Sequence, residues 1–134
     1  MTGDGVTTVR SSFGAEETKS RLEASLKAKG LTIFAEIDHA AGAAAGGLSL
    51  RPTALIIFGN AKGGTPLMQA AQTAGIDLPL KALIWEDASG VAWLSYNDPA
   101  WIGQRHGLSA EAIPAIDAIS NLLGGLAATV TEGP

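Results

Sequence analysis

The residues most suited to bind a ligand lie between a buried apolar run and the start of a predicted helix. Ala54–Phe58 reads ALIIF and is followed by Gly59–Pro66, which reads GNAKGGTP. Backbone N–H groups at a helix N-terminus attract anions, and the ammonium group of Lys62 adds positive charge. We therefore expect a small phosphate- or carboxylate-bearing molecule to bind at Asn60, Lys62, Gly63, Gly64 and Thr65. The alternative is a tight turn whose glycines supply positive φ and whose Thr65 only caps the helix.

The same segment excludes one class of enzyme. Gly59 and Gly64 have the spacing of the glycines in a P-loop, but Thr65-Pro66 stands where a P-loop has Lys followed by Ser or Thr. A nucleoside-triphosphatase is therefore not expected.

A second group of polar residues joins another predicted strand to a helix. Tyr96 and Asn97 could donate hydrogen bonds to a ligand held beside the glycine segment. The alternative gives this group only structural roles, with Asp98 capping the helix that Pro99 opens and Asn97 shaping the turn.

The chain has two histidines, His39 and His106, which are weak candidates for metal ligands. Either could act as an acid or base, or bind a metal together with Glu86, Asp87 or Asp98. They lie 67 positions apart, and neither has a second ligand three or four residues away on a helix. No catalytic residue is assigned, and we expect neither a metal nor a cofactor.

Composition excludes several further classes. The 134 residues are 46% hydrophobic and 16% charged, which is typical of a folded domain and not of a disordered chain. Nine basic and thirteen acidic residues give a net charge of −4 without a basic run, so nucleic acid is not an expected partner. No cysteine is present to form a disulfide or a thiolate zinc site. We find no signal peptide and no run of about 18 apolar residues, and expect a cytoplasmic protein without a membrane partner.

The apolar periodicity predicts two main helices and five strands. Helices are expected over 15–29 and from Ser109 to Gly124-Gly125, and short helices over 39–45, from Thr65-Pro66 to Ala74 and over 98–105. Strands are expected over 6–12, 31–37, 54–58, 81–85 and 91–96, with a hairpin turn at Glu86–Gly90. This order suits an antiparallel sheet with both main helices on one face. We predict a single domain over 6–130, with flexible ends at 1–5 and 131–134.

Several of these segments resemble the DUF302 family. Phe58–Gln69 looks like the signature of that family, and the likeness continues through Asp77–Lys81, Glu86-Asp87, Leu94–Pro99 and Arg105-His106. Upstream, Thr18–Leu22, Gly30, Ile37–Ala40 and Leu50–Pro52 also fit. It covers roughly residues 6–126. The resemblance implies a TBP-like two-layer α+β domain of order β-α-β(4)-α that is often a homodimer. The biochemical role of the family is undefined, so the resemblance assigns no site residue.

Three functions remain open at this point. The first is binding of a small anionic molecule at Gly59–Thr65. The second is a homo-oligomeric interaction module without a small ligand, and the third is a metal-dependent enzyme that uses histidine and carboxylate groups.

Overall fold

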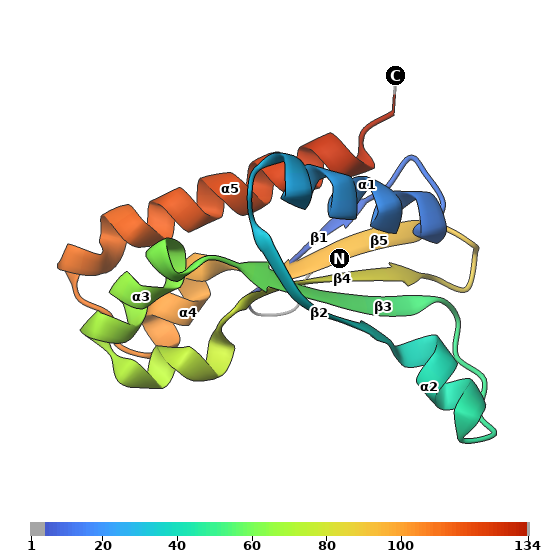
Figure 1. Cartoon of the computed structure of the whole chain (residues 1–134), viewed down its shortest axis with the longest axis horizontal. Helices are drawn as coiled ribbons and strands as arrows, with labels where there is room; N and C mark the ends of the chain where they lie inside the picture. The colour runs from blue at the N-terminus through green and yellow to red at the C-terminus, as the bar shows by residue number, and fades with distance from the viewer. Residues whose placement is uncertain (1–4, 134) are drawn as a thin grey trace.

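Five strands form one antiparallel sheet in residues 5–133, the part of the chain that this computed structural model describes (Figure 1). Their order across the sheet is β1-β5-β4-β3-β2. The strands are β1 (Val6–Arg10), β2 (Thr32–Asp38), β3 (Thr53–Gly59), β4 (Leu80–Glu86) and β5 (Ala92–Asn97). The helices are α1 (Ala15–Ala28), α2 (His39–Ala45), α3 (Ala61–Ala70), α4 (Pro99–Arg105) and α5 (Ile113–Thr131), with 3₁₀ helices η1 (Gln72–Asp77) and η2 (Ala110–Ala112). The predicted α+β class and order of main elements are confirmed.

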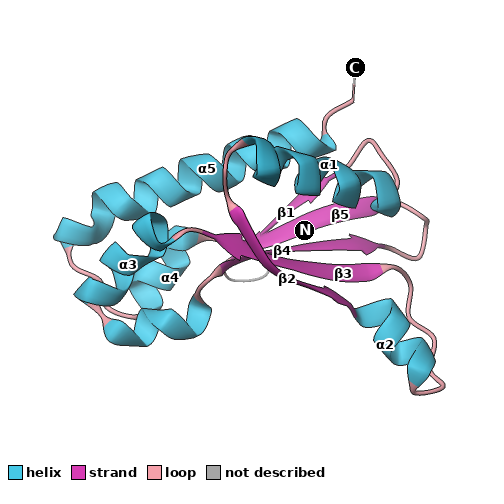
Figure 2. Cartoon of the chain, in the orientation of Figure 1, coloured by secondary structure: helices cyan, strands magenta, loops and turns pink. Residues whose placement is uncertain are grey.

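The two long helices cover the same face of the sheet, as predicted. Figures 1 and 2 show α1 and α5 above the strands, α3 and α4 beyond one end, and α2 projecting from the other end. Leu22 and Leu26 of α1 and Leu123 of α5 pack onto Phe58 and Ile84 of the sheet, and all five side chains are at most 3% exposed. Burial of these aliphatic and aromatic groups is the main stabilising term for a domain of this size.

Two aspartates begin helices as the sequence predicts. An Oδ1 atom of Asp38 accepts a hydrogen bond from the N–H of Ala41 at 2.9 Å, and Asp98 accepts one from Ala100 at the same distance. Each carboxylate satisfies an N–H group that the first helical turn leaves without a partner. The predicted starts of α2 and α4 are confirmed.

Strand β2 is more exposed than the sequence predicts. The residue alternation of this strand predicts that one face is covered and the other partly covered, but six of its seven residues are exposed and only Ile33 is partly buried. Its place in the sheet explains the difference, because β2 is an edge strand that pairs only with β3. Its apolar side chains therefore face solvent at the edge, with Phe34 55% and Ile37 42% exposed.

Helix α5 continues beyond its predicted end. It passes through Gly124-Gly125 and ends at Thr131, whose side chain is buried and donates a hydrogen bond to the carbonyl of Ala127. Leu126 and Val130 bury against the core, and this burial outweighs the cost of two glycines in a helix. Thr131, the first residue of the predicted flexible C-terminal end, is thus the last residue of a helix. Residues 1–4 and 134 of the predicted flexible ends lie outside the described residues.

The segment Ala110–Thr131 is also long and apolar enough to cross a membrane, by length and composition alone. This corrects the expectation that no stretch of the chain meets that test. In this fold the segment packs on α1 and on the sheet. Of its most apolar stretch of 18 residues, 33% is buried inside the domain.

The turn between β4 and β5 is organised by Asp87. Its carboxylate accepts hydrogen bonds from the N–H groups of Ser89 and Val91 and, at 2.8 Å, from Nε1 of Trp93. The bond from Trp93 and those from the backbone lower the pKa of Asp87. Trp85 and Trp93 stack across the hairpin with ring centroids 6.0 Å apart. Asp87 therefore ties the backbone of the turn to the Trp93 side chain of β5.

Candidate functional site

Residues Ala61–Gly64 of the predicted glycine-rich loop form the first turn of α3, and no loop precedes the helix there. Asn60, rather than Thr65, is the N-cap: its Oδ1 accepts a hydrogen bond from the N–H of Gly63 at 2.9 Å. Pro66 consequently lies inside the helix instead of at its first position. The predicted start was wrong because two cap signals stand five residues apart, and the structure uses the earlier one.

Asn60 also engages part of the backbone that the anion hypothesis needs. Its carbonyl oxygen accepts from the N–H groups of Gly63 and Gly64 at 3.3 and 3.4 Å, so these amides already have protein partners. The N–H groups of Ala61 and Lys62 come first in the helix and have no carbonyl one turn earlier within it. Fewer backbone N–H groups therefore remain to bind an anion than the sequence predicted.

A cavity of about 310 Å³ lies beside this first turn. This volume is at the lower end for small-molecule sites. Fifteen residues line it, and only Asn60 and Thr65 among them have polar side chains. The lining comes from β2 and the residue before it, the β3–α3 junction, η1, the start of β4, and α5: Leu31, Phe34, Gly59, Asn60, Ala61, Gly63, Gly64, Thr65, Met68, Gly75, Leu78, Pro79, Leu80, Ile119 and Leu122. The cavity is therefore apolar, with one polar end at the α3 N-terminus.

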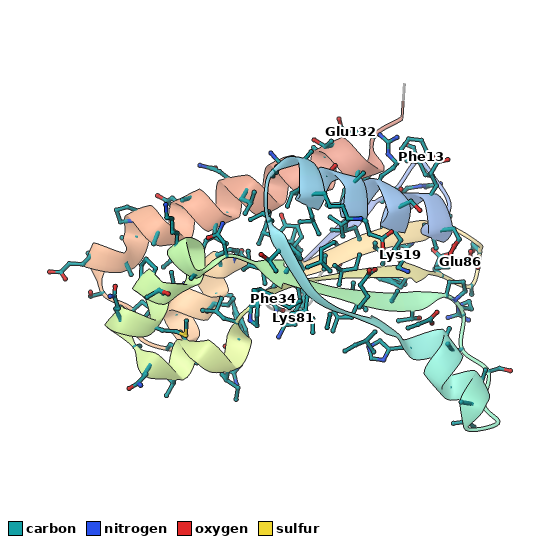
Figure 3. All side chains as sticks on the ribbon, viewed as in Figure 1. Phe13, Lys19, Phe34, Lys81, Glu86 and Glu132 are labelled. Atoms are coloured by element: carbon teal, nitrogen blue, oxygen red, sulfur yellow. The ribbon has the colours of Figure 1, made fainter. Side chains whose placement is uncertain are left out.

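Phe34 reaches the cavity through an irregularity in β2. Ile33 pairs with Phe58 and Ala35 with Ile57, so Phe34 is an extra residue without a partner in β3. Such a bulge changes the direction of a side chain on an edge strand. Phe34, labelled in Figure 3, is 55% exposed and contributes the one aromatic ring of the lining. Phe34 is not among the predicted site residues, since an exposed phenylalanine in a strand gives no local signal of a bulge.

The predicted site residues do not all meet. Asn60, Gly63, Gly64 and Thr65 line the cavity, whereas Lys62 is exposed on the same turn and is outside the lining. Tyr96 and Asn97 are also outside it. They pair with Thr7 and Val6 of β1, and β4 stands between them and β3. Burial raises the pKa of the Tyr96 phenol. The structure thus separates the two polar groups that the sequence analysis placed together.

The two histidines occupy opposite ends of the fold. His39 is exposed at the start of α2, and His106 follows α4 (Figure 1). Within residues 5–133 no group of three His, Asp or Glu side chains is arranged to hold a metal. Among the described residues, neither histidine therefore belongs to a set of three potential metal ligands.

His106 instead joins a polar cluster that sequence analysis did not find. Its Nε2 lies 2.5 Å from an oxygen of Asp77, and its Nδ1 lies 2.9 Å from the hydroxyl of Thr73. Arg105 donates from Nη1 to both carboxylate oxygens of Asp77, at 2.8 and 3.1 Å. Asp77 is 7% exposed, and an acidic residue amid the apolar run after Gly75 is the one local signal that could have indicated it.

A solved structure shares this fold at low sequence identity. A crystal structure of an uncharacterized conserved DUF302 protein from Bacillus stearothermophilus superposes with a TM-score of 0.84 over 97% of this chain and 100% of the other, at 19% identity. At that identity the likeness shows the fold alone.

Curated relatives in two Brucella species are half identical in the matched region. A protein named "Fluoride-specific ion channel FluC 1" from Brucella suis is 50% identical over 115 residues, which are 86% of this chain and 45% of the relative. The protein of the same name from Brucella abortus matches equally, over 43% of its length. The chain therefore spans less than half the length of these relatives.

One family covers most of the chain. Residues 7–126 match the family described as "Domain of unknown function DUF302". This range includes every residue that lines the cavity and the polar cluster of Thr73, Asp77, Arg105 and His106. The resemblance seen in the sequence is confirmed: the chain belongs to the DUF302 family.

Proposed function

We propose that this domain binds a small molecule with an apolar body and an anionic end. The observation that carries the proposal is the cavity of about 310 Å³, apolar along its length and polar where it meets the first turn of α3. Ligand sites of this kind use apolar walls for affinity and a few polar groups for orientation.

The wall favours an alkyl or aromatic body. Leu78, Leu80, Ile119 and Leu122 present aliphatic side chains, and Phe34 adds a ring at an exposed position of the edge strand. Each buried methylene contributes about 0.8 kcal/mol to binding. A purely ionic ligand would leave these walls without contacts, so an extended apolar part accounts for the cavity better than a bare anion.

The α3 N-terminus favours a negative charge at the other end. The N–H groups of Ala61 and Lys62 open the helix, and the helix dipole adds a partial positive charge there. Lys62 brings a full positive charge to the same turn. A carboxylate or phosphate that enters beside Asn60 and Thr65 would meet these groups.

A panel of matched ligands tests the proposal. Straight-chain carboxylates of about six to ten carbons are expected to raise the melting temperature, and primary alcohols of equal length to raise it less. Phosphate and fluoride are added alone, fluoride because the matched Brucella proteins are named as fluoride-specific channels. If no carboxylate shifts the melting temperature, the proposal is wrong. A response to fluoride alone would assign the site to the halide instead.

Replacement of Lys62 by alanine measures the electrostatic part. We expect the Kd for the carboxylate to rise about two- to fivefold, which corresponds to about 0.3–1 kcal/mol for a charge at a helix end. The Kd for the matched alcohol should stay the same. Lys29→Ala, at the exposed end of α1, is the control. Equal loss of alcohol and carboxylate binding, measured by calorimetry, would place the anion elsewhere.

We also propose that two copies associate through the sheet face that α1 and α5 leave uncovered. Leu55 pairs with Leu83, and Trp85 with Trp93, on the side opposite buried Ile56 and Ile84. Partly exposed apolar groups of this kind favour a protein partner. Sedimentation at about 10 μM should give a dimer that Leu83→Glu converts to a monomer. A monomeric wild-type protein at that concentration would contradict this proposal.

A further inference from the structure

The cluster at His106 has the donor and acceptor pattern of a proton relay that ends at a surface hydroxyl. Asp77 and Thr73 come from η1, and His106 follows α4. The side chain of His106 is 6% exposed and that of Asp77 is 9% exposed, whereas Thr73 is exposed. The chain of contacts thus runs from a buried carboxylate through a buried imidazole to a hydroxyl that solutes can reach.

The carboxylate fixes which imidazole nitrogen carries the proton. An ionised carboxylate can only accept, so Nε2 of His106 donates to Asp77. In the tautomer that carries its proton on Nε2, Nδ1 holds the lone pair and can accept from the Thr73 hydroxyl 2.9 Å away. Arg105 donates to both oxygens of Asp77 and keeps the carboxylate in place. This is the logic by which an orienting acid prepares a histidine base for a nucleophilic hydroxyl, with the two ring nitrogens exchanged.

The buried threonine hydroxyls of the domain have different partners. Thr18 donates to the carbonyl of Gly14, and Thr131 to that of Ala127. A carbonyl oxygen holds the hydroxyl proton in place but is not a base. Thr73 alone among the described residues places its hydroxyl on an imidazole nitrogen. Its exposure and its partner together distinguish it from the rest.

We propose that Thr73 is a nucleophile that accepts an acyl group from activated carboxylic esters. Its Oγ1 forms a bond to the acyl carbon while His106 Nδ1 takes the hydroxyl proton. The ester C–O bond then breaks, and the leaving alkoxide or phenolate takes that proton from His106. The result is an ester on Thr73 and a free alcohol, with no oxidant or cofactor required. Thr73 does not line the cavity, so this reaction and ligand binding there are independent.

The test uses p-nitrophenyl acetate and mass spectrometry of the whole chain. We expect one acetyl group on the peptide that contains Thr73, which hydroxylamine removes because it is an ester. Acetyl groups on lysine are amides and remain. Thr73→Val should abolish the hydroxylamine-sensitive group and Thr73→Ser should keep it. Thr129→Val, at an exposed threonine of α5, should have no effect.

Two further variants test whether Thr73 reacts because His106 activates its hydroxyl or only because the hydroxyl is exposed. His106→Gln keeps an N–H toward Asp77 but removes the base, and the acylation rate should fall about 100-fold. Asp77→Asn presents an amide that can donate to Nε2, so the ring can reverse its tautomer and donate from Nδ1 to Thr73. The expected result is again about 100-fold slower acylation in a folded protein, checked by circular dichroism. Labelling of Thr73 no faster than of Thr129, or unchanged in His106→Gln, would overturn the proposal.

Discussion

Replacement of Gly64 by leucine is expected to abolish ligand binding in the cavity without loss of the fold. A Cβ at this position would lie 3.4 Å from Cδ1 of Leu78 and 3.9 Å from Cε of Met68, two residues that line the cavity. The larger side chain would occupy the space of about four ligand methylenes. At about 0.8 kcal/mol each, their exclusion raises Kd about 100-fold or more. Calorimetry with the best carboxylate of the panel measures the effect.

Two controls separate occlusion from damage to the helix. Gly64→Ala adds only a methyl group at ordinary contact distance and should bind nearly as well as the wild type. Gly124→Leu makes the same change in α5, where a Cβ would meet nothing within 4 Å, and should leave Kd unchanged. Neither leucine should lower the melting temperature, because leucine is the better helix former by about 0.5–1 kcal/mol. Unimpaired binding by Gly64→Leu would show that the ligand lies outside the cavity.

Replacement of Asp77 by alanine is expected to destabilise the domain by about 2–3 kcal/mol. The change leaves the buried Nε2 of His106 without its acceptor and removes the anion that Arg105 contacts. Breaking a fully buried pair costs about 3–5 kcal/mol, and we take a lower figure because the side chain of Arg105 is 46% exposed and solvent screens it. The melting temperature should fall by about 10 °C. Urea unfolding gives the free energy directly.

The matched variants make the cause specific. Asp77→Asn should cost less than Asp77→Ala, since the imidazole can reverse its tautomer and Thr73 can then accept. Asp117→Ala removes an exposed acid on α5 and should change stability by less than about 0.5 kcal/mol. If Asp77→Ala were as stable as Asp117→Ala, the cluster would contribute nothing to holding η1 against α4.

Features that depend on a few neighbouring residues could be predicted from the sequence. The caps at Asp38 and Asp98 need one side chain and an amide two or three residues later, and both are present. Gly30 after α1 has φ +72°, a left-handed conformation that glycine commonly supplies at the end of a helix. The start of α3 was predicted wrongly because two residues, Asn60 and Thr65, could each cap the helix.

The candidate site was only partly predictable for a different reason. Its polar end lies within one helical turn and carries a local signal. Its walls come from Phe34, from Leu78 and from Ile119, which lie far apart in the chain and meet only through tertiary packing. Asp77 and His106 are 29 positions apart and meet in the same way. Single-sequence patterns contain no information on such contacts, so the cluster could not be inferred before the fold was known.

The bulge at Phe34 also bears on the solubility of the domain. An open edge strand presents unpaired N–H and C=O groups on which a strand from another chain can add, and this is how many sheet proteins aggregate. In β2 the extra residue interrupts the regular repeat of these groups, and the charged side chains of Glu36 and Asp38 follow on the same strand. Deletion of Phe34 would remove the bulge and leave a longer regular row of unpaired N–H and C=O groups along β2. A strand of another molecule could add to that row more easily than to the native edge.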